Sequence, residues 1–462
     1  MRYLPHTPED IGAMLGAIGK GSLDELFESI PAAVRQPGRI DLPPGVDEQA
    51  LMRHLEALGQ KNASGHLSFL GAGAYDHGFP IAADQLLLRS ELYTAYTPYQ
   101  PEVAQGTLQL IFEFQTIVSE ILGLPIANAS MYDGSTAAAE AVLMARRLTG
   151  RSQSIVSGCV HPEYLETVTT LTRELDLGGP SGKSELVAVP ARADGRTDVE
   201  ALVAAIDGST ACVLVGYPSF FGCVSDLRAV AAAAHAHGAL LVTATTEPFA
   251  LALCEAPGAL GADIAVAEGQ PLGLPPQYGG PGVGLFACQN DRKTLQQLPG
   301  RLCGETVDKN GTRGYVLTLS TREQHIRRER ATSNICTNSG LCAAALTIKM
   351  CLLGKRGFVA TAEQCLAKAE HLRQRLGALP GYAVTSAAPT FNELAVRVRG
   401  GDAGAVCRAL ATEGIVAGLD LGRYYPARRD ELLVAVTERH SAADLERLVS
   451  ALAAFGTPRT AP

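Results

Sequence analysis

Patterns that would place this protein in a membrane, on a secretory route or in a metal-binding class are absent from its sequence. The eleven cysteines include no C-x-x-C pair, and no His-x₃-His pair occurs. A disulfide or zinc framework is therefore not expected, and reduced thiols in the cytoplasm fit the sequence better. No apolar run is long enough to cross a bilayer, and the opening residues MRYLPHTPEDIG lack the charged-then-apolar pattern of a secretory signal.

Charged residues are also few, and their balance is slightly acidic. They make up 19% of the 462 residues, hydrophobic residues make up 47%, and the formal net charge is −8. This is the composition of a soluble globular protein, and it gives no reason to expect nucleic acid or a membrane as a partner. His235 and His237 are two residues apart and face different sides of a predicted helix, so no metal site is predicted.

Short apolar segments alternate with predicted helices from residue 150 onward. The predicted strands are Ser154–Ser157, Leu186–Val189, Cys212–Gly216, Ala239–Thr243 and Ile264–Ala267. This alternation indicates βαβ units and a mostly parallel sheet that helices cover on both faces. Ligands of such sheets bind beyond the carboxyl ends of the strands, which here are residues 217–226, 243–248 and 268–273.

Three regions are predicted from the change in pattern along the chain. Residues 1–63 form a helical arm without any motif that suggests chemistry. Residues 64–335 form the large α/β domain together with long loops, and residues 336–462 form a smaller α+β domain. The first long helix of that smaller domain is expected to end at Gly354.

The stretch ADIAVAEGQPLGLPPQYGGPGVGLFA, residues 262–287, predicts two strands around a Pro/Gly-rich loop. It resembles the lysine-bearing hairpin of the large pyridoxal phosphate (PLP) enzymes related to aspartate aminotransferase. In those enzymes the Schiff-base lysine follows the first strand, and that position falls at Gln270 or Pro271. Neither residue can form an imine. No lysine lies between Lys183 and Lys293, so a relocated lysine would be one of these two, both in polar, loop-like sequence.

Two more sites that contact PLP in that fold can be located in this sequence by the same resemblance. An aspartate that pairs with the pyridinium nitrogen in the PLP fold is replaced by Ala244. Gly134, Ser135 and Thr136 begin an alanine-rich predicted helix, whose free N–H groups form a possible anion site similar to the phosphate cup of that fold. The alternative is an ordinary helix N-cap. Because the lysine and the aspartate are both missing, this chain is expected to bind no cofactor covalently, and the cup is expected to be vestigial.

Loops rich in glycine, tyrosine and polar residues occupy residues 64–106, and loops this long usually have a function or cover a surface. A second unusual segment, TREQHIRRERATSNICTN, contains four arginines. This run is either a solvated helix face or a surface that recognises an anion. The arginines are Arg322, Arg327, Arg328 and Arg330.

Four motifs together resemble the glycine decarboxylase (P-protein) family of the glycine cleavage system, and the likeness extends over nearly the whole chain. The motifs are NASGHLSFLGAGAYDHGFP, YTPYQPEVAQGTLQLIFEFQT, MYDGSTAAAEA and RRERATSNICTN. In some prokaryotes this enzyme consists of two homologous chains, and only one of them carries the PLP lysine. The present chain is similar to the other one, subunit 1.

The resemblance implies the PLP-dependent transferase fold (aspartate aminotransferase-like, fold type I), with a mostly parallel seven-stranded sheet and a smaller C-terminal α+β domain. It also implies a chain that works on a partner's cofactor. Glycine would be decarboxylated on PLP of the lysine-bearing subunit 2, and the aminomethyl group would pass to the lipoyl H-protein. The pair would form a dimer of heterodimers. Residues of the long loops would enter the partner's site, namely His77, Tyr96, Tyr99 and Glu102. The alternatives are tyrosines that only pack at an interface, a scaffold that merely stabilises the partner, and a self-sufficient PLP enzyme with a relocated lysine.

Overall fold

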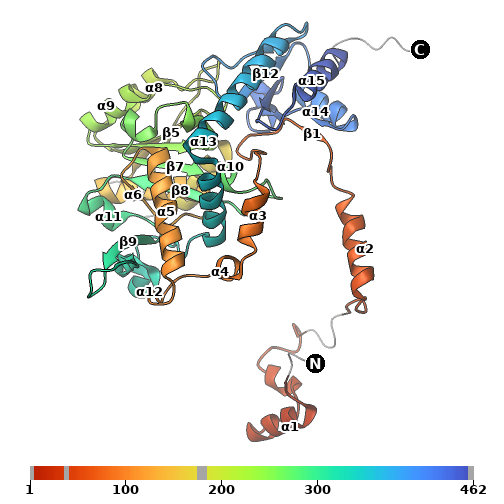
Figure 1. Cartoon of the computed structure of the whole chain (residues 1–462), viewed down its shortest axis with the longest axis vertical. Coiled ribbons are helices and arrows are strands. Elements are labelled where there is room, and N and C mark those ends of the chain that lie inside the picture. The colour runs from red at the N-terminus through yellow and green to blue at the C-terminus, as the bar shows by residue number, and fades with distance from the viewer. Residues whose placement is uncertain (1–4, 36–40, 174–184, 456–462) are drawn as a thin grey trace. The chain divides into compact units, whose positions relative to one another are not determined.

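The computed structural model of the chain describes residues 5–35, 41–173 and 185–455 (Figure 1). Contacts divide the chain into two units, Met1–Ser64 and Gly65–Pro462. None of the helices in the described part is long and apolar enough to span a membrane. The three-region division at residues 63 and 335 stays a prediction.

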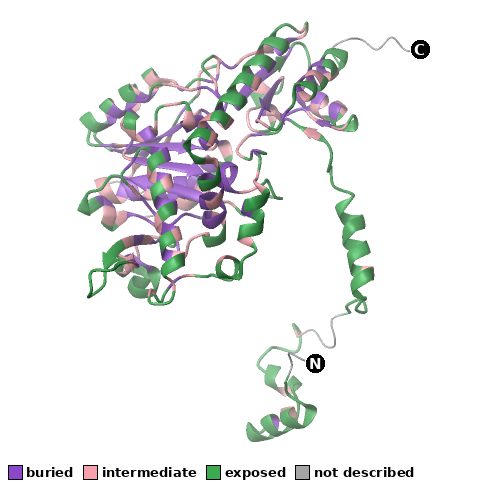
Figure 2. Cartoon of the chain, in the orientation of Figure 1, coloured by how far each residue is buried: buried purple, intermediate pink, exposed green. Residues whose placement is uncertain are grey.

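The first unit is helical, and most of its described apolar side chains are exposed (Figure 2). Helix α1 (Pro8–Ala17) begins after Thr7, which forms a reciprocal capping box with Asp10. A short 3₁₀ helix, Asp24–Phe27, follows α1. Helix α2 (Glu48–Gly59) begins after its N-cap Asp47.

The second unit is built on a seven-stranded sheet with the strand order β2-β8-β7-β6-β5-β3-β4 (Figure 1). Strands β3 to β7 run parallel, and β8 is antiparallel to both of its neighbours. The predicted mostly parallel seven-stranded sheet is confirmed. The strands are β2 (Ile126–Ala127), β3 (Gln153–Ser157), β4 (Glu185–Val189), β5 (Thr210–Gly216), β6 (Leu240–Thr245), β7 (Ile264–Glu268) and β8 (Gly284–Cys288).

Helices cover both faces of this sheet because its strands are apolar on both sides (Figure 2). Val213 and Val215 of β5 enter one core, whereas Cys212 and Leu214 enter the other. Full burial of a valine or leucine side chain contributes about 1.5–3 kcal/mol. The described α-helices of this unit that precede residue 340 are α3 (Ile81–Leu87), α4 (Ser90–Tyr93), α5 (Gln105–Leu122), α6 (Gly134–Thr149), α7 (Pro162–Thr172), α8 (Val199–Ala205), α9 (Arg228–Ala236), α10 (Gln270–Gly273), α11 (Arg292–Gln297) and α12 (Gln324–Arg327).

Helix α13 (Gly340–Gly377) leads to a second, four-stranded sheet with the order β11-β12-β15-β14. The expected end of a helix at Gly354 appears as a break inside α13, where Gly354 has a non-helical backbone with φ of 59°. The remaining elements are β1 (Leu67–Ser68), β11 (Tyr382–Val384), β12 (Glu393–Val398), α14 (Ala403–Thr412), β13 (Ile415–Val416), β14 (Leu419–Asp420), β15 (Glu431–Ala435) and α15 (Ala442–Phe455).

One hairpin was not expected from the sequence. Strands β9 (Leu302–Val307) and β10 (Arg313–Thr318) pair antiparallel around a short turn. The turn contains Asn310-Gly311, and Gly311 has a φ of 81°, which a glycine adopts without strain. An Asn-Gly pair between two β-rich segments is a hairpin signal, so this element was detectable.

Candidate functional site

The carboxyl end of β7 carries the position where the PLP fold has its lysine. Strand β7 ends at Glu268, and Gln270 begins the short helix α10 after Gly269. The Gln270 side chain is buried: Oε1 accepts from the Tyr75 N–H (3.1 Å), and Nε2 donates to the Tyr75 carbonyl (3.1 Å). The Nε2 also donates to the Leu274 carbonyl (2.6 Å). This amide therefore joins the residue 71–77 loop to the hairpin and has no amine to offer.

The position of the pyridinium aspartate is apolar in this chain. Ala244 is buried on β6 and packs in the core beside Val242 and Val266. Its neighbour Thr245 donates to the Tyr217 carbonyl (2.6 Å). The nearby carboxylate of Glu247 accepts from His77 and Asn392 instead.

The first turn of α6, where the phosphate cup is predicted, is occupied by two carboxyl groups of the chain itself. Asp133 caps the helix by accepting from the Thr136 N–H (2.8 Å) and the Ser135 hydroxyl (2.7 Å). Glu268 accepts from the Gly134 N–H (2.8 Å). Burial raises the pKa of Glu268 to about 7, although three backbone N–H groups favour its ionised form.

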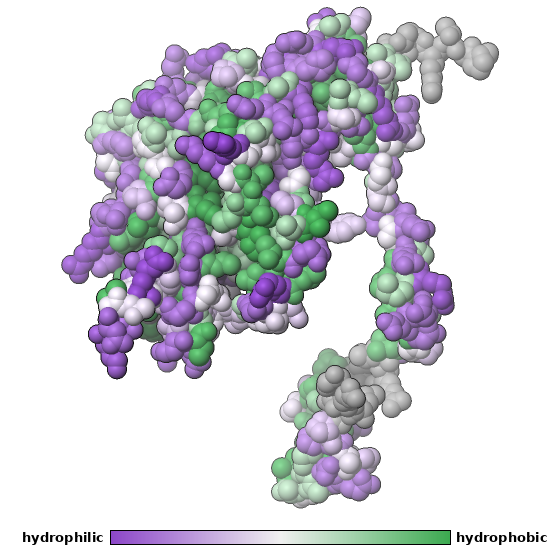
Figure 3. Space-filling view, viewed as in Figure 1, coloured by the Kyte–Doolittle hydropathy of each residue, from purple (hydrophilic) through white to green (hydrophobic). Residues whose placement is uncertain are grey.

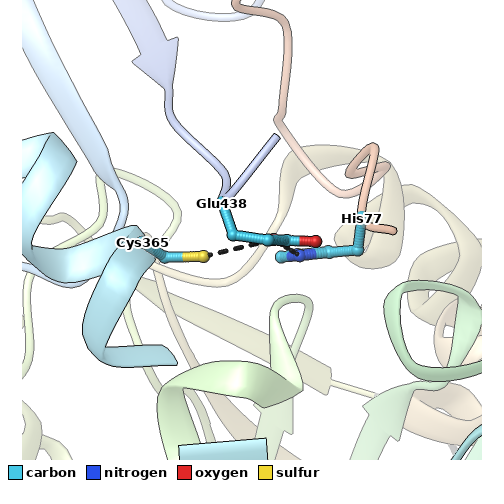
Figure 4. A group of neighbouring side chains, drawn as sticks. All are labelled: His77, Cys365 and Glu438. Atoms are coloured by element: carbon cyan, nitrogen blue, oxygen red, sulfur yellow. Dashed lines mark hydrogen bonds and ion pairs between the residues drawn. The ribbon is translucent and has the colours of Figure 1, made fainter. Parts of the chain in front are cut away.

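A buried ionic cluster lies beside this edge of the sheet (Figure 4). The imidazole of His77 lies between two carboxylates, with Nε2 2.8 Å from Glu247 and Nδ1 2.6 Å from Glu438. Burial opposes the imidazolium form, but the charge of Glu247 and the hydrogen bonds with Cys365, Glu247 and Glu438 outweigh it and raise the pKa of His77 well above its ordinary value. In turn, His77 and the Gly78 N–H outweigh the burial of Glu438 and lower its pKa to about 2.

The ring nitrogen of His77, the thiol of Cys365 and a carboxylate oxygen of Glu438 lie close enough together to be compared with a metal site (Figure 4). The N···O separation of 2.6 Å between His77 and Glu438 is a hydrogen-bond distance. Two ligands about 2.0–2.2 Å from one tetrahedral zinc ion would lie more than 3 Å apart. The contact is therefore an ion pair, and we propose no metal here.

The loop of residues 94–104, between α4 and α5, is called the tyrosine loop here. It presents its predicted site residues on the surface of this chain. Tyr96 and Glu102 are exposed. Tyr99 is also exposed, but its hydroxyl accepts from Arg301 (3.2 Å), and its ring lies 5.0 Å from that guanidinium. His77, by contrast, is 2% exposed and pairs within its own chain, so the structure does not bring it together with the other three.

The four arginines of the second unusual segment divide into two groups. Arg322 is buried and donates to the carbonyls of Leu298, Gly300 and Leu319, so it is a structural residue. The other three, Arg327, Arg328 and Arg330, are exposed. Neither predicted alternative therefore describes the whole run.

Apolar side chains gather on one face of the second unit, over α3, α5 and α13 (Figure 3). A pocket beside this face is lined by Tyr96, Leu92, Leu110, Asn338 and Cys342 among others. Contiguous exposed apolar area of this kind typically marks an interaction surface. Exposed large apolar residues on or directly after α3 and on α13 are Ile81, Leu86, Leu88, Leu341 and Leu352.

Comparisons with known proteins agree with this geometry. The family described as "Glycine cleavage system P-protein" matches residues 1–452. The chain is 70% identical to the probable glycine dehydrogenase (decarboxylating) subunit 1 of Sorangium cellulosum, over 98% of this chain and 100% of the relative. It is 50% identical to the protein of the same description from Caulobacter vibrioides, over 98% and 99%.

The chain belongs to the glycine cleavage system P-protein family.

A solved glycine decarboxylase (P-protein) of the glycine cleavage system, in inhibitor-bound form, superimposes with a TM-score of 0.86. It is 41% identical and covers 98% of this chain and 100% of its own. A sphingosine-1-phosphate lyase of Burkholderia pseudomallei shares the fold with a TM-score of 0.63 at 18% identity, over 93% of this chain and 96% of its own. The predicted PLP-dependent transferase fold is thereby confirmed.

This member of the P-protein family does not have the residues that would hold PLP in its own site. Gln270 is fixed by three hydrogen bonds, Ala244 supplies no carboxylate, and Glu268 accepts from the helix N–H that a phosphate would use. The relocated-lysine alternative gains no support from Lys293, which follows β8 at the opposite end of the sheet from Glu268. Lys183 lies outside the described residues.

Sequence reasoning about this P-protein chain missed Lys349, which α13 places directly beside the hairpin. Its Nζ donates to the Pro271 carbonyl (2.8 Å) and lies 5.6 Å from the Phe249 ring. Burial lowers the pKa of Lys349 to about 8, against the attraction of Glu438, Glu247 and Asp76. No sequence signal marks this lysine, because the Pro271 carbonyl that it contacts lies 78 residues away in the sequence.

Glu393 gives a prediction for the pH dependence of stability. It is buried, accepts from the Ala72 N–H (2.7 Å) and the Tyr75 hydroxyl (2.8 Å), and has its pKa raised to about 7 by burial, with the charge of Glu247 adding to the effect. An acid whose pKa rises on folding favours the fold when protonated. Its contribution is therefore present below the ordinary value near 4.5 and is lost as the pH rises to about 7.

We therefore expect Glu393→Gln, which stays neutral, to become more stable relative to wild type as the pH rises from 4.5 to 8, by up to about 3 kcal/mol. Urea unfolding of both proteins at several pH values measures this difference. Parallel pH profiles would show that folding does not raise the pKa of Glu393.

Proposed function

We propose that this chain is subunit 1 of a glycine dehydrogenase (decarboxylating), the P-protein of the glycine cleavage system, and acts in the cytoplasm. The proposal rests on one observation: a P-protein fold with Gln270 and Ala244 at its coenzyme-binding positions and with the carboxyl group of Glu268 bound to the first N–H of α6. The electron-withdrawing chemistry that decarboxylation of glycine needs is supplied by PLP on a lysine-bearing partner subunit. The aminomethyl group is then transferred to the lipoyl H-protein.

This chain contributes surface to that assembly. A pocket lined by Tyr96, Leu110 and Leu341 joins the apolar face over α5 and α13 to the tyrosine loop, so one partner surface would cover both. Aromatic residues are enriched at such interfaces and have a polar end that can reach a substrate. Tyr96, Tyr99 and Glu102 are exposed beside this face, and we assign them to the shared active site. His77 is excluded from this set because it is buried within its own chain. The assembly would be a dimer of heterodimers.

The test is reconstitution with a lysine-bearing P-protein subunit. Each chain is purified alone and after co-expression, and the exchange of the glycine carboxyl group with labelled bicarbonate is measured in the presence of lipoyl H-protein. We expect exchange only from the pair, which should co-purify at a one-to-one ratio. Exchange by this chain alone would contradict the proposal.

A scaffold without any part in the chemistry is the second candidate, favoured by the same filled site around Gln270 and Glu268. The two candidates differ in what the partner can do without this chain. If a soluble, folded lysine-bearing subunit exchanges bicarbonate at the rate of the pair, the scaffold is correct. A rate that depends on this chain at equal partner stability favours the shared active site.

A further inference from the structure

The N-terminus of helix α6 lies inside the protein, next to the ends of β7 and β8. Gly134 is buried, and most of the residues of α6 are buried with it. The first N–H groups of a helix have no partner within the helix, and they carry a partial positive charge. A buried helix start therefore needs an acceptor, and in many nucleotide- and phosphate-binding proteins a ligand phosphate provides it.

In this chain Glu268 provides that acceptor. One oxygen, Oε2, accepts from the Gly134 N–H (2.8 Å). The other, Oε1, accepts from the N–H groups of Gln270 (2.9 Å) and Val283 (3.1 Å). Both carboxyl oxygens are thus bound to backbone, and they join the start of α6 to the two arms of the β7–β8 hairpin.

The space around this contact is filled. A Cβ added to Gly134 would overlap the hydroxyl of Tyr164, and one added to Gly282 would lie 2.9 Å from the Asp133 side chain and 3.3 Å from both Glu268 oxygens. Tyr164 is itself buried. A phosphate group, which is larger than a carboxyl group, has no room beside Glu268 unless this side chain leaves.

We propose that Glu268 acts as a built-in substitute for a bound phosphate, so that this chain is structurally complete without a coenzyme and binds no phosphate or coenzyme at its own α6 N-terminus. The inference concerns this chain alone. It stands whether or not the shared active site proposed above is correct, because it is tested without the partner.

The first test is binding to the wild-type chain alone. Pyridoxamine 5′-phosphate is the probe, because it carries the phosphate and ring of the coenzyme and cannot form imines with surface lysines. Equilibrium dialysis at up to 5 mM probe, about the weakest affinity worth calling a site, should show no saturable binding, and inorganic phosphate should not raise the melting temperature. Saturable binding of the probe, lost on competition with inorganic phosphate, would overturn the inference and leave the proposed function untouched.

The second test removes the carboxyl group. Glu268→Ala should melt at a lower temperature than wild type, by about 5 °C or more, because three backbone N–H groups lose their acceptor. Acetate at 100 mM should recover a large part of that loss, whereas an equal concentration of chloride should not, because acetate supplies the missing carboxylate. If folded Glu268→Ala melts at the wild-type temperature, or gains no more from acetate than from chloride, the substitute role is wrong.

Glu140→Ala is the matched control. Glu140 is a buried glutamate on the same helix, but its Oε2 has no hydrogen-bond partner in the described structure. Its removal leaves a cavity without a row of N–H donors, so acetate should not stabilise this variant more than chloride does. Equal acetate rescue of both variants would also contradict the proposal. If Glu268→Ala does not fold, the dialysis of the wild-type chain still decides.

Discussion

We expect the variant His77→Gln to be less stable than wild type by about 3–5 kcal/mol near pH 7, because it leaves a buried negative charge unpaired. The side chains of His77 and Glu247 are 1% and 3% exposed, so the ion pair is shielded from water. Glu438 forms the second ion pair with His77. Lys349 is attracted by the same two carboxylates and by Asp76, the residue directly before His77. Two cations thus oppose the two buried carboxylates, and the substitution removes one of them.

The pH dependence of this loss follows from the two shifted groups. His77 has a raised pKa, so its stabilisation is complete below its ordinary value of 6.5 and disappears as the pH rises through the higher value of the folded state. Glu438 has its pKa lowered from 4.5 to about 2, so its stabilisation is present above 4.5 and disappears toward pH 2. The difference between wild type and His77→Gln should therefore be largest between about pH 4.5 and 6.5.

His161→Gln is the control for this experiment. His161 is also buried, and its Nε2 bonds to the Ala72 carbonyl (2.8 Å), but no carboxylate among the described residues is hydrogen-bonded to its ring. Its substitution should cost about 1–2 kcal/mol, for one hydrogen bond and some aromatic packing, and this cost should show no maximum between about pH 4.5 and 6.5. Urea unfolding measures both variants. A loss from His77→Gln that does not change with pH would mean that folding does not shift the pKa of His77.

The sheet and the missing lysine were predictable because both depend on local sequence. The apolar segments that form β5, β6 and β7 are bounded by turn residues, and the antiparallel β7–β8 hairpin places Gln270 just beyond the strand end, as expected. Residues that lie a fixed number of positions after a strand have a defined place at the sheet edge. An absence at such a position can be seen without a structure.

The polar network around that edge was not predictable, because its members are far apart in the sequence. His77 contacts residues 170 and 361 positions away, and Lys349 contacts a carbonyl 78 positions away. Glu268 is the last residue of an apolar strand, and nothing in that strand shows that its carboxyl group reaches the start of α6. Placing His77 in a partner's site was an inference from the surrounding motif, whereas the structure shows its side chain buried within its own chain.

The double variant Tyr99→Phe/Glu102→Gln is expected to lower turnover of the reconstituted pair by about tenfold or more while leaving the complex intact. Arg301, which is buried, fixes the position of Tyr99. It donates to the tyrosine hydroxyl and to the Cys336 carbonyl (2.9 Å), and it pairs with Glu323 (3.2 Å). An exposed tyrosine side chain held this firmly is suited to orient a group on a partner. Loss of the hydroxyl and of the nearby carboxylate removes polar contacts but almost no apolar area, so association should persist.

The control removes the same two groups elsewhere on the chain. In Tyr424→Phe/Glu200→Gln, one hydroxyl that donates to Glu163 and one exposed carboxylate that pairs with Arg192 are lost, both away from the tyrosine loop. Exchange of labelled bicarbonate and co-purification are measured for both double variants at saturating glycine. A tenfold loss in the first variant with an unchanged control and an intact complex assigns Tyr99 and Glu102 to the shared site. Unchanged turnover in both would reduce the tyrosine loop to interface packing and leave the scaffold as the better account.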